Sequence, residues 1–497
     1  MAARDKLLPE VAEFLKPDPV QMFIDGQWTP ADDGGTFETL DPGDGALLAR
    51  VAEGKAADID RAVAAAQKAF ASEAWGGLAV KDRAVLLHRL ADLVEAHSDA
   101  LIQLESLDVG KPIPQADFDV TNVALMLRWY ADLAVHTRYS EPIATPNFEA
   151  RQIRVPYGVA AFILPWNFPI LLAGWNISPA LAAGNTVVIK PAENTPLSAL
   201  LLCALAKEAG FPPGVINVVP GFGDTAGAAL AAHTGIKRMA FTGSPAVGKL
   251  IASSCGANLV PVKLELGGKG AAVVFDDMDP KVVAQKLTES VTLNTGQVCC
   301  TATRWLVQKK LWDKFVPAAT QAMKSVKIGH GLEATTQMGP MVSQTQRERV
   351  LDYLERGRKD GAEALLEGGP VTVADHPDGF YITPALLTGA PDNVCAQEEI
   401  FGPAAYAIPF GDEAEAVALV NDCPYGLANS VWTADLGRAN RVAEAMVAGS
   451  SWINGHNLFP PGVPFGGCNL SGLGGGVGSA ATFFDYLRNQ SIVRPLE

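Results

Sequence analysis

The feature that most constrains the fold is a repeated alternation of segments that begins near Arg151. From there on, short apolar runs that end in Pro or Gly are each followed by a stretch with helical spacing. Such alternation predicts a parallel sheet covered by helices. A second series of the same kind runs from about Gly267 to Gly474. In the first series the strand-like segments are 158–164, 186–189, 215–219 and 238–241, and the helix-like segments are 197–209 and 225–232.

The flanking segments have a different character. Between about Asp58 and Gln103 the apolar residues recur with helical spacing, which predicts two or more amphipathic helices. Residues 141–155 contain prolines and alternate in polarity, which favours a protruding hairpin, and 483–493 is a further strand candidate. Neither strand segment has a local partner, so we expect both to pair with another subunit.

Length, charge and cysteine usage narrow the class of protein. A chain of 497 residues exceeds one ordinary core, so we expect two or three domains. The net charge of -15 disfavours nucleic acid or an anionic membrane as a partner. Residues 1–21 carry no apolar core of the signal-peptide type, and no run of 18 apolar residues occurs. The seven cysteines are scattered without a C-x-x-C pattern, which indicates reduced thiols and a cytoplasmic location.

Two loops have features of phosphate-binding turns. In the first, Ser244 suits a helix N-cap and Pro245 suits the first helical position, so free backbone N–H groups can face a phosphate. Its glycine spacing also approaches that of a P-loop, but Leu250 stands where Ser or Thr should hold magnesium. The second loop, 221–226, resembles a dinucleotide fingerprint but lacks the acidic residue that should follow. Ordinary strand-to-helix turns are an equal alternative for both loops.

A lysine and a glutamate lie at the end of the predicted strand 186–189. Lys190 and Glu193 stand at the carboxyl edge, where open α/β sheets bind ligands. A carboxylate there can accept hydrogen bonds from both ribose hydroxyls and repels a 2′-phosphate, which favours NAD over NADP. On these two residues alone, a solvated strand end is the simpler interpretation.

Two adjacent cysteines, Cys299 and Cys300, follow a helical pattern that ends at Asn294-Thr-Gly296. They therefore stand on a connection, where reactive groups are commonly held. Adjacent cysteines form a strained disulfide, and they lack the spacing and the histidine of a zinc site. Taken alone, they are more simply buried structural thiols than nucleophiles.

Two further residues suit chemistry on a carbonyl group. Prolines on both sides of Trp166-Asn167-Phe168 fix the backbone, and a preorganised amide at Asn167 suits an oxyanion. Glu265 ends an alternating strand beside a glycine pair, and such a carboxylate suits a general base. The alternatives are that Asn167 satisfies loop backbone and that Glu265 is a surface charge.

The assembled motifs resemble those of the NAD(P)-dependent aldehyde dehydrogenases over nearly the whole chain. The resemblance implies a hydrolytic enzyme that oxidises an aldehyde to a carboxylic acid, with NAD as cofactor, NADP less favoured, water as co-substrate and no metal. The motifs are Pro165-Trp-Asn-Phe-Pro169, Lys190-Pro-Ala-Glu193, Phe241-Thr-Gly-Ser244, Leu264-Glu-Leu-Gly-Gly-Lys269, Gly296-Gln-Val-Cys299, Glu398-Glu-Ile-Phe-Gly-Pro403 and Pro464-Phe-Gly-Gly467.

The same resemblance implies roles for individual residues. Cys299 is the implied nucleophile, Asn167 with the Cys299 backbone N–H holds the oxyanion, and Glu265 activates the water that releases the acid. The implied cofactor residues are Trp166, Lys190, Glu193, Gly243, Ser244, Glu399 and Phe401. The implied substrate-pocket residues are Phe168, Trp175, Leu293, His456, Phe459 and Phe465. Because this last set is largely apolar and aromatic, we expect an uncharged aliphatic or aromatic aldehyde.

The family fold implies an α/β protein with three parts. A Rossmann-type NAD-binding domain is expected at 1–137 and 159–262, and an α/β catalytic domain at 263–477. A small β oligomerisation hairpin is expected at 138–158 and 478–497, in a homodimer or homotetramer. Asn176 and Gly476 depart from many relatives, which carry a linked lysine and glutamate there for proton escape. We hypothesise that protons leave through Glu265 and water instead.

Overall fold

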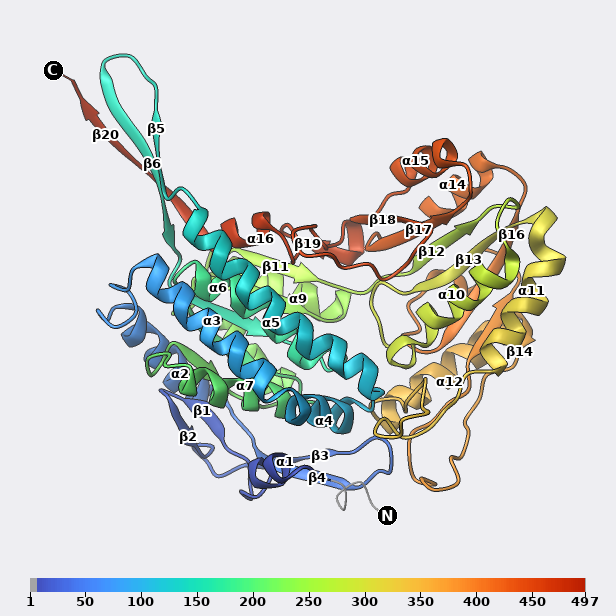
Figure 1. Cartoon of the computed structure of the whole chain (residues 1–497), viewed down its shortest axis with the longest axis horizontal. Helices are drawn as coiled ribbons and strands as arrows, with labels where there is room; N and C mark the ends of the chain where they lie inside the picture. Colours follow the sequence, from blue (N-terminus) through green and yellow to red (C-terminus); the bar gives the residue numbers. More distant parts are fainter. Residues whose placement is uncertain (1–6, 497) are drawn as a thin grey trace.

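The structure is a computed structural model that describes residues 7–496. Figure 1 shows two α/β bodies side by side, with a thin β arm projecting from the first body. Residues 1–6 and 497 of the expected terminal segments lie outside the described residues.

The first body is built on an eight-stranded sheet with the order β19-β11-β10-β7-β8-β9-β1-β2. The strands from β11 to β9 run parallel, as the alternating pattern predicts, and β19 and β1 join antiparallel. The bounds are β1 Met22–Ile24, β2 Gln27–Thr29, β7 Val159–Ile163, β8 Thr186–Lys190, β9 Ile216–Val218, β10 Arg238–Thr242, β11 Val262–Glu265 and β19 Gly472–Leu473.

Helices cover both faces of this sheet. Alternate residues of β7 separate the two cores: Phe162 packs on one side, and Val159 and Ala161 pack on the other. The helices of the first core are α3 Val80–Ala96, α4 Ser98–Val109, α5 Ile113–His136, α6 Pro169–Ala182 and α7 Leu197–Glu208. The second core contains α2 Ala56–Phe70, the π-helical turn η2 Gly223–Gly227, α8 Ala228–Ala232 and α9 Pro245–Ala257. The amphipathic helices predicted between residues 58 and 103 are therefore confirmed as α2, α3 and α4.

The second body is built on a seven-stranded sheet with the order β14-β15-β16-β13-β12-β17-β18, parallel except for β14. Its strands are β12 Gly270–Val274, β13 Ala302–Gln308, β14 Glu363–Leu366, β15 Ala385–Thr388, β16 Ala404–Phe410, β17 Ala428–Trp432 and β18 Ser450–Ile453. Its helices are α10 Pro280–Thr292, α11 Lys309–Lys324, α12 Gln344–Lys359, α13 Val394–Gln397, α14 Glu413–Asn421 and α15 Leu436–Ala445.

The change from the first sheet to the second falls later than the expected boundary at residue 262. Strand β11 pairs in parallel with β10, so Glu265 still belongs to the first sheet. The short strand β19, inside the segment expected to be catalytic, also returns to the first sheet and pairs Gly472 with Glu265. Glu265 is thus held between two strands at the junction of the bodies.

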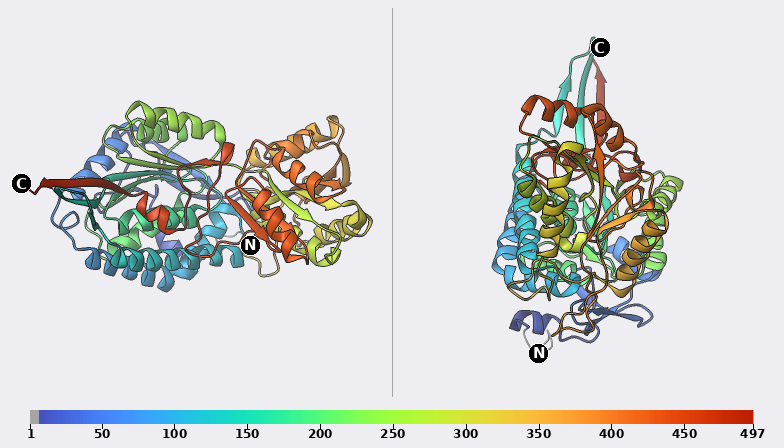
Figure 2. Two further views of the ribbon diagram at one scale, coloured as in Figure 1. Left: turned by 90° about the horizontal axis from the view of Figure 1, so that it is seen from above. Right: turned by 90° about the vertical axis from the view of Figure 1, so that its right-hand side faces the viewer.

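The projecting arm is a three-stranded sheet with the order β20-β6-β5. Its strands are β5 Ser140–Ile143, β6 Phe148–Pro156 and β20 Leu487–Pro495. Figure 2 shows the C-terminal strand running along the hairpin, away from both bodies. The protruding hairpin is confirmed. The two segments for which we expected pairing with another subunit also pair with each other, because β6 and β20 are antiparallel partners along their whole length. The start of the predicted strand 483–493 belongs instead to α16 Ala480–Phe484.

The remaining elements are small. They are α1 Pro9–Phe14, the antiparallel pair β3 Thr36–Leu40 and β4 Leu47–Ala52, and the short 3₁₀ turns η3 Leu293–Gly296 and η4 Asn469–Ser471. None of the helices formed by residues 7–496 combines the length and the apolar character that a membrane crossing requires.

Candidate active site

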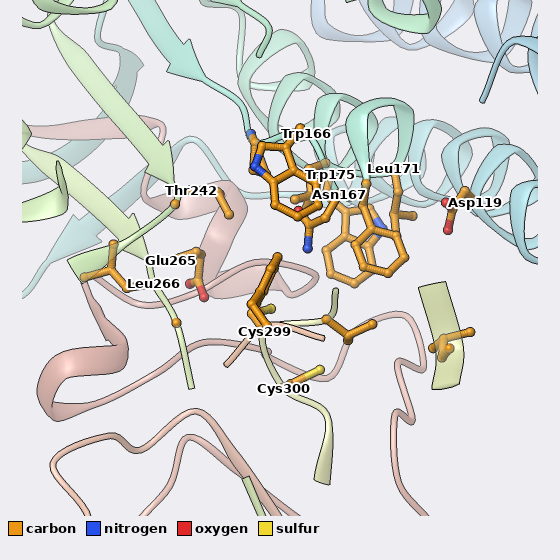
Figure 3. Close-up of a pocket in the computed structure, with 18 of the residues that line it drawn as sticks. Asp119, Trp166, Asn167, Leu171, Trp175, Thr242, Glu265, Leu266, Cys299 and Cys300 are labelled. Atoms are coloured by element: carbon orange, nitrogen blue, oxygen red, sulfur yellow. The ribbon is translucent and has the colours of Figure 1, made fainter. Parts of the chain in front are cut away.

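A cavity of about 440 Å³ lies where the two bodies meet, and both contribute to its lining. Figure 3 shows Asn167 and Glu265 on either side of Cys299, with Cys300 beyond it. Of the residues predicted for the site, the cavity is lined by Trp166, Asn167, Phe168, Trp175, Gly243, Ser244, Glu265, Leu293, Cys299, Glu399, Phe401, Phe459 and Phe465. Lys190, Glu193 and His456 do not line it.

Cys299 follows a strained turn at the end of α10. Asn294, Thr295 and Gly296 all adopt positive φ, at 44°, 56° and 72°. A β-branched residue such as Thr295 rarely adopts this conformation, so the surroundings must hold it. Its Oγ1 donates to the Gly339 carbonyl at 2.9 Å, and the Gln297 Nε2 donates to the Asn294 carbonyl at 2.9 Å. The turn therefore holds the cysteine loop in one conformation.

The glycine pair after β11 lets this loop approach the first sheet. A Cβ on Gly268 would lie 2.4 Å from the Cys299 carbonyl oxygen, closer than any side chain tolerates. A Cβ on Gly267 would lie 2.0 Å from a carboxylate oxygen of Glu399. Glycine is thus required where β11 passes between the cysteine and Glu399.

Asn167 is buried beside the cysteine loop and is tied to it from both ends. Its side-chain Nδ2 donates to the Gln297 backbone carbonyl at 2.9 Å. Its backbone carbonyl accepts from the Asn294 Nδ2 at 2.8 Å. Because the amide NH₂ carries two hydrogens, one remains available to an oxygen in the cavity. The amide is therefore preorganised in the way that an oxyanion site requires.

Glu265 ends β11 with its carboxyl group in the cavity and 7% of its surface exposed. Its Oε2 makes no hydrogen bond within residues 7–496. Burial raises its pKa, and the positive charge of Lys263 partly opposes this shift. A carboxyl group with a raised pKa is a better base than an ordinary glutamate once it has ionised.

The surroundings of the Cys299 thiol favour its protonated form. Its pKa is raised well above the usual value, first by a hydrogen bond with the Cys300 side chain and then by burial. A thiol with a raised pKa must lose its proton before it can attack. The neighbouring Cys300 is only 2% exposed, and its thiol points towards Asn457, with 3.5 Å between its Sγ and the Asn457 Oδ1.

The predicted cofactor residues around the cavity come from loops of both sheets. The Ser244 side chain caps α9 by accepting from the Val247 N–H, and Pro245 begins the helix, as the sequence predicts. The Trp166 and Phe401 rings meet edge to face with 5.2 Å between centroids. The Glu399 Oε1 accepts from the Gly268 N–H at 2.9 Å, while burial raises its pKa to about 7.

Lys190 and Glu193 lie apart from the cavity at the carboxyl end of β8. The Lys190 Nζ is 3.2 Å from the Glu193 Oε2, and the lysine is 3% exposed. Strand β8 pairs directly with β7, whose following loop carries Trp166. The two residues therefore stand at the same edge of the sheet as the cavity, one strand further along.

The predicted substrate residues form an aromatic wall. The Phe459 ring lies 5.8 Å from Trp175 and 5.2 Å from Phe465, measured between centroids. The Trp175 Nε1 donates to the Asn122 Oδ1 at 2.6 Å, which fixes the indole. Phe168 and Leu293 pack against the same cluster as the cysteines. This side of the cavity offers an apolar surface.

His456 lies behind the cysteines instead of on the cavity wall. Its Nδ1 is 2.9 Å from the Ser430 Oγ, and its Nε2 is 2.8 Å from the Cys300 carbonyl oxygen. Burial lowers its pKa to about 4, so the ring is neutral at physiological pH. Because both ring nitrogens bond to other protein groups, neither is free to bond to the substrate. The ring positions the cysteine loop instead.

Sequence reasoning missed residues that two helices bring to the cavity. Helix α5 supplies Gln115, Phe118 and Asp119, and α12 supplies Gln346 and Arg349. Asp119 is buried, and its Oδ2 lies 2.5 Å from the Lys111 Nζ. These residues stand in long helical stretches with no motif. The only sequence signal for this part of the site is a set of charged residues, such as Asp119, within an apolar pattern.

Asn176 and Gly476 supply no ionisable group. Asn176 is buried within α6, where its Nδ2 donates to the Leu172 carbonyl at 2.8 Å. Gly476 adopts φ 75° at the end of a run of three glycines. Nor do the described residues gather three side chains able to hold a metal ion.

Comparisons with known proteins agree on one family. The model of the aldehyde dehydrogenase family matches residues 28–492. A phenylacetaldehyde dehydrogenase of Pseudomonas fluorescens is 41% identical over 96% of this chain and 96% of its own. A mitochondrial aldehyde dehydrogenase of Rattus norvegicus is 42% identical over 91% of this chain and 88% of its own. The structure of the NAD⁺ complex of a Bacillus cereus aldehyde dehydrogenase superposes with a TM-score of 0.95 at 39% identity, covering 99% of both chains. The chain therefore belongs to the aldehyde dehydrogenase family.

Proposed function

We propose that this protein oxidises an uncharged aldehyde to a carboxylic acid with NAD, and that Cys299 is its nucleophile. One observation carries the assignment: Cys299, Asn167 and Glu265 come from three separate segments of the chain and line one cavity. A nucleophile, an oxyanion donor and a base in one enclosed space are the parts that acyl chemistry on a carbonyl needs.

The residues at the sheet edge fit a dinucleotide. Pro245 at the start of α9 leaves free backbone N–H groups beside Ser244, which suits a pyrophosphate. A Cβ on Gly243 would lie 2.5 Å from the Phe241 ring, so this turn has only backbone to offer. Glu193 beside Lys190 suits the ribose hydroxyls and disfavours a 2′-phosphate, which supports NAD over NADP. Glu399 and Phe401 complete the site on the opposite side.

The reaction begins with a bond between the Cys299 sulfur and the aldehyde carbon. The thiol proton leaves through water to solvent, and Asn167 and the Cys299 N–H hold the developing oxyanion. A bound NAD supplies the hydride acceptor, and loss of hydride leaves a thioester on Cys299. Glu265 then takes a proton from water, whose oxygen attacks the thioester carbon; the carbon–sulfur bond breaks and releases the acid and the Cys299 thiolate.

The aromatic wall supports an aromatic or aliphatic substrate without a charge. Trp175, Phe459 and Phe465 offer ring edges and faces to a side chain of similar shape. Asp119, one of the acidic groups on the lining, is already paired with Lys111. The name of the Pseudomonas fluorescens relative, a phenylacetaldehyde dehydrogenase, supports the same class.

We also propose a homodimer or homotetramer in the cytoplasm. The arm exposes apolar side chains, among them Ile143, Phe148 and Val493, far from either core. Its outer strands β5 and β20 each have one unpaired edge, which suits pairing with a second copy. The cysteines are all free thiols, in keeping with a reducing compartment.

Paired cysteine variants test the proposal. With phenylacetaldehyde and NAD, Cys299→Ser should lose NADH formation, whereas Cys300→Ser should keep most of it. Benzaldehyde, hexanal and betaine aldehyde compare substrate classes, and NADP replaces NAD in a parallel series. Loss of activity in Cys300→Ser alone would overturn the assignment of the nucleophile. Preference for betaine aldehyde would overturn the substrate class.

A further inference from the structure

Behind Glu265 lies a group of buried polar atoms that find no hydrogen-bond partner within residues 7–496. They are the Arg238 Nε, the Lys263 Nζ, the Glu265 Oε2, the Asp485 Oδ2 and the Tyr486 hydroxyl. Buried polar atoms are nearly always satisfied, and in proteins ordered water supplies the partners that side chains do not. Five such atoms from neighbouring residues therefore indicate a hydrated polar region inside the first body.

The strands bring these residues together. Lys263 and Glu265 are two residues apart in β11, so both point to the same face of the sheet. Lys263 lies beside Ala240 of β10, and Arg238 points to the same face of that strand as Ala240. The Lys263 Nζ lies 5.3 Å from the centre of the Tyr486 ring, and an Arg238 nitrogen lies 3.8 Å from the Asp485 Oδ2.

Glycines pack closely along this group. A Cβ on Gly466 would lie 3.0 Å from the Glu265 Oε1. A Cβ on Gly474 would lie 3.2 Å from the Lys263 Cα, and one on Gly475 would lie 3.0 Å from the Asp485 Oδ2. Each glycine thus lies against one member of the group, and a side chain at any of the three positions would crowd it.

The group also reaches the surface. Lys263 is 1% exposed and Glu265 is 7% exposed, but 32% of the Asp485 side chain is exposed. Asp485 directly follows α16. The polar atoms therefore lead from the cavity, past a buried ammonium group, to a carboxylate that solvent can reach.

We propose that Lys263 and Asp485 form the route by which the proton that Glu265 takes from the attacking water leaves the active site. This inference rests on the proposed function, because it assigns a route to the proton that Glu265 removes. Lys263 is a positioning residue that acts through Glu265 and touches neither the aldehyde nor the cofactor.

One proton moves from the attacking water to solvent in each turnover. Water loses a proton to the Glu265 carboxylate while its oxygen forms a bond to the thioester carbon; the carbon–sulfur bond breaks with its electron pair on the Cys299 thiolate, which attacks the next aldehyde. Lys263, as an ammonium, releases a proton through water to Asp485 and the solvent, and its neutral amine accepts the proton from Glu265 through water. Each turnover sends one proton from the water to solvent and restores both side chains, with no other reactant.

The electrostatics of the surrounding elements suit this exchange. Burial lowers the pKa of Lys263; Glu265 and Asp485 oppose that shift, and Arg238 adds to it. Burial raises the pKa of Asp485, against the charges of Arg238 and Lys263. Tyr486 faces the same space and stays neutral because burial raises its pKa, as it does for Tyr130 of α5. The pKa of Lys263 is lowered and the pKa of Glu265 is raised, so the two values lie closer together. Similar pKa values favour proton exchange between the two groups.

The experiment follows both phases of the reaction in Lys263→Met by rapid mixing with phenylacetaldehyde and NAD. The first burst of NADH should keep its amplitude, while the steady-state rate should fall by about tenfold, less than the loss of the base itself would cause. Because the variant removes a positive charge near Glu265, the acid limb of the steady-state pH profile should move up by about one unit. Methylamine added to Lys263→Ala should restore part of the rate.

Three further variants decide the outcome. Asp485→Asn, at a partly exposed position, should show a smaller fall in the same phase if Lys263→Met does not fold. Lys269→Met is the matched control, because this buried lysine lies by Cys395, Arg304 and the cofactor residue Glu399 instead of Glu265, so both phases should change together and the ratio of burst to steady-state rate should stay at the wild-type value. In the Glu265→Gln background, Lys263→Met should add no further loss.

Each result supports or overturns the route. An unchanged pH profile and steady-state rate in both Lys263→Met and Asp485→Asn would overturn it, and so would an additive loss in the double variant. If Glu265→Gln slows hydrolysis while Lys263→Met does not, the route fails and the proposed function stands. If neither variant slows hydrolysis, the role of Glu265 fails together with the route.

Discussion

The two sides of the cavity that flank Cys299 are built in opposite ways. On one side, the cysteine loop and Asn167 are joined by hydrogen bonds in both directions, and the strained turn at Thr295 is held in place. On the other side, Glu265 and Lys263 carry buried polar atoms that find no such partners in the described part of the chain. The attacking group and the oxyanion site thus require fixed geometry, whereas the base requires a path along which charge can move.

We expect the largest effect from a substitution at Glu265. Glu265→Gln keeps the shape of the side chain but removes the base, so steady-state turnover should fall by about 10²–10⁴-fold. Stopped-flow measurement of NADH separates thioester formation from hydrolysis, and the steady-state phase should suffer most. A loss confined to the burst would show that Glu265 acts only on the thiol proton and not on water.

The next largest effect is expected from a substitution that displaces the cysteine loop but keeps Cys299 and Asn167. Gly268→Ala places a methyl group 2.4 Å from the Cys299 carbonyl oxygen, so the loop must shift. Because a misplacement of about 1 Å can reduce turnover about 10²-fold, kcat should fall on that scale while the fold persists. Gly256→Ala in α9 is the control, since nothing lies within 4 Å of its added Cβ. Equal kcat in the two variants would show that the loop is less rigid than its contacts indicate.

A smaller effect concerns pH and the support of the cysteine loop. The folded pKa of His456 is about 4, below its usual value of 6.5, because burial disfavours the charged ring. The neutral ring therefore stabilises the fold fully above pH 6.5, and this contribution is lost as pH falls towards 4. Thermal unfolding followed between pH 7 and pH 4.5 should show a steeper decline for the wild type than for His456→Gln. Parallel declines would contradict the role of the neutral ring.

The smallest effect is expected at Cys300. Its thiol raises the pKa of Cys299 by hydrogen bonding, so Cys300→Ala should lower that pKa and shift the pH dependence of the burst slightly towards acid. Steady-state turnover should change by less than about threefold, because hydrolysis on the Glu265 side is untouched. Iodoacetamide labelling of Cys299 across pH measures the shift directly. An unchanged labelling profile would show that the two thiols do not interact.

Much of the first side could be predicted from the sequence, because its parts are short and local. Ser244 with Pro245 predicted the start of α9, and Asn294-Thr-Gly296 predicted a turn before the cysteines; the structure confirms both. Glycines and prolines restrict the backbone within a few residues, so their patterns carry over to the fold.

The second side and the arm could not be predicted in the same way. Lys263 belongs to none of the sequence-predicted sites, since its neighbours Asp485 and Tyr486 are more than two hundred residues away in the chain. The pairing of β6 with β20 and the place of His456 behind Cys300 also depend on distant segments. Such contacts follow from the packing of the whole chain, which local propensities do not determine.

The most direct test of the account is to trap the intermediate between the two sides. Glu265→Gln, mixed with phenylacetaldehyde and NAD and quenched in acid, should carry a phenylacetyl group on the peptide that contains Cys299. Peptide mass spectrometry with fragmentation locates the group, and Cys299→Ser in the same background should abolish it. An acyl group on Cys300, or no acyl group while NADH is formed, would contradict the account.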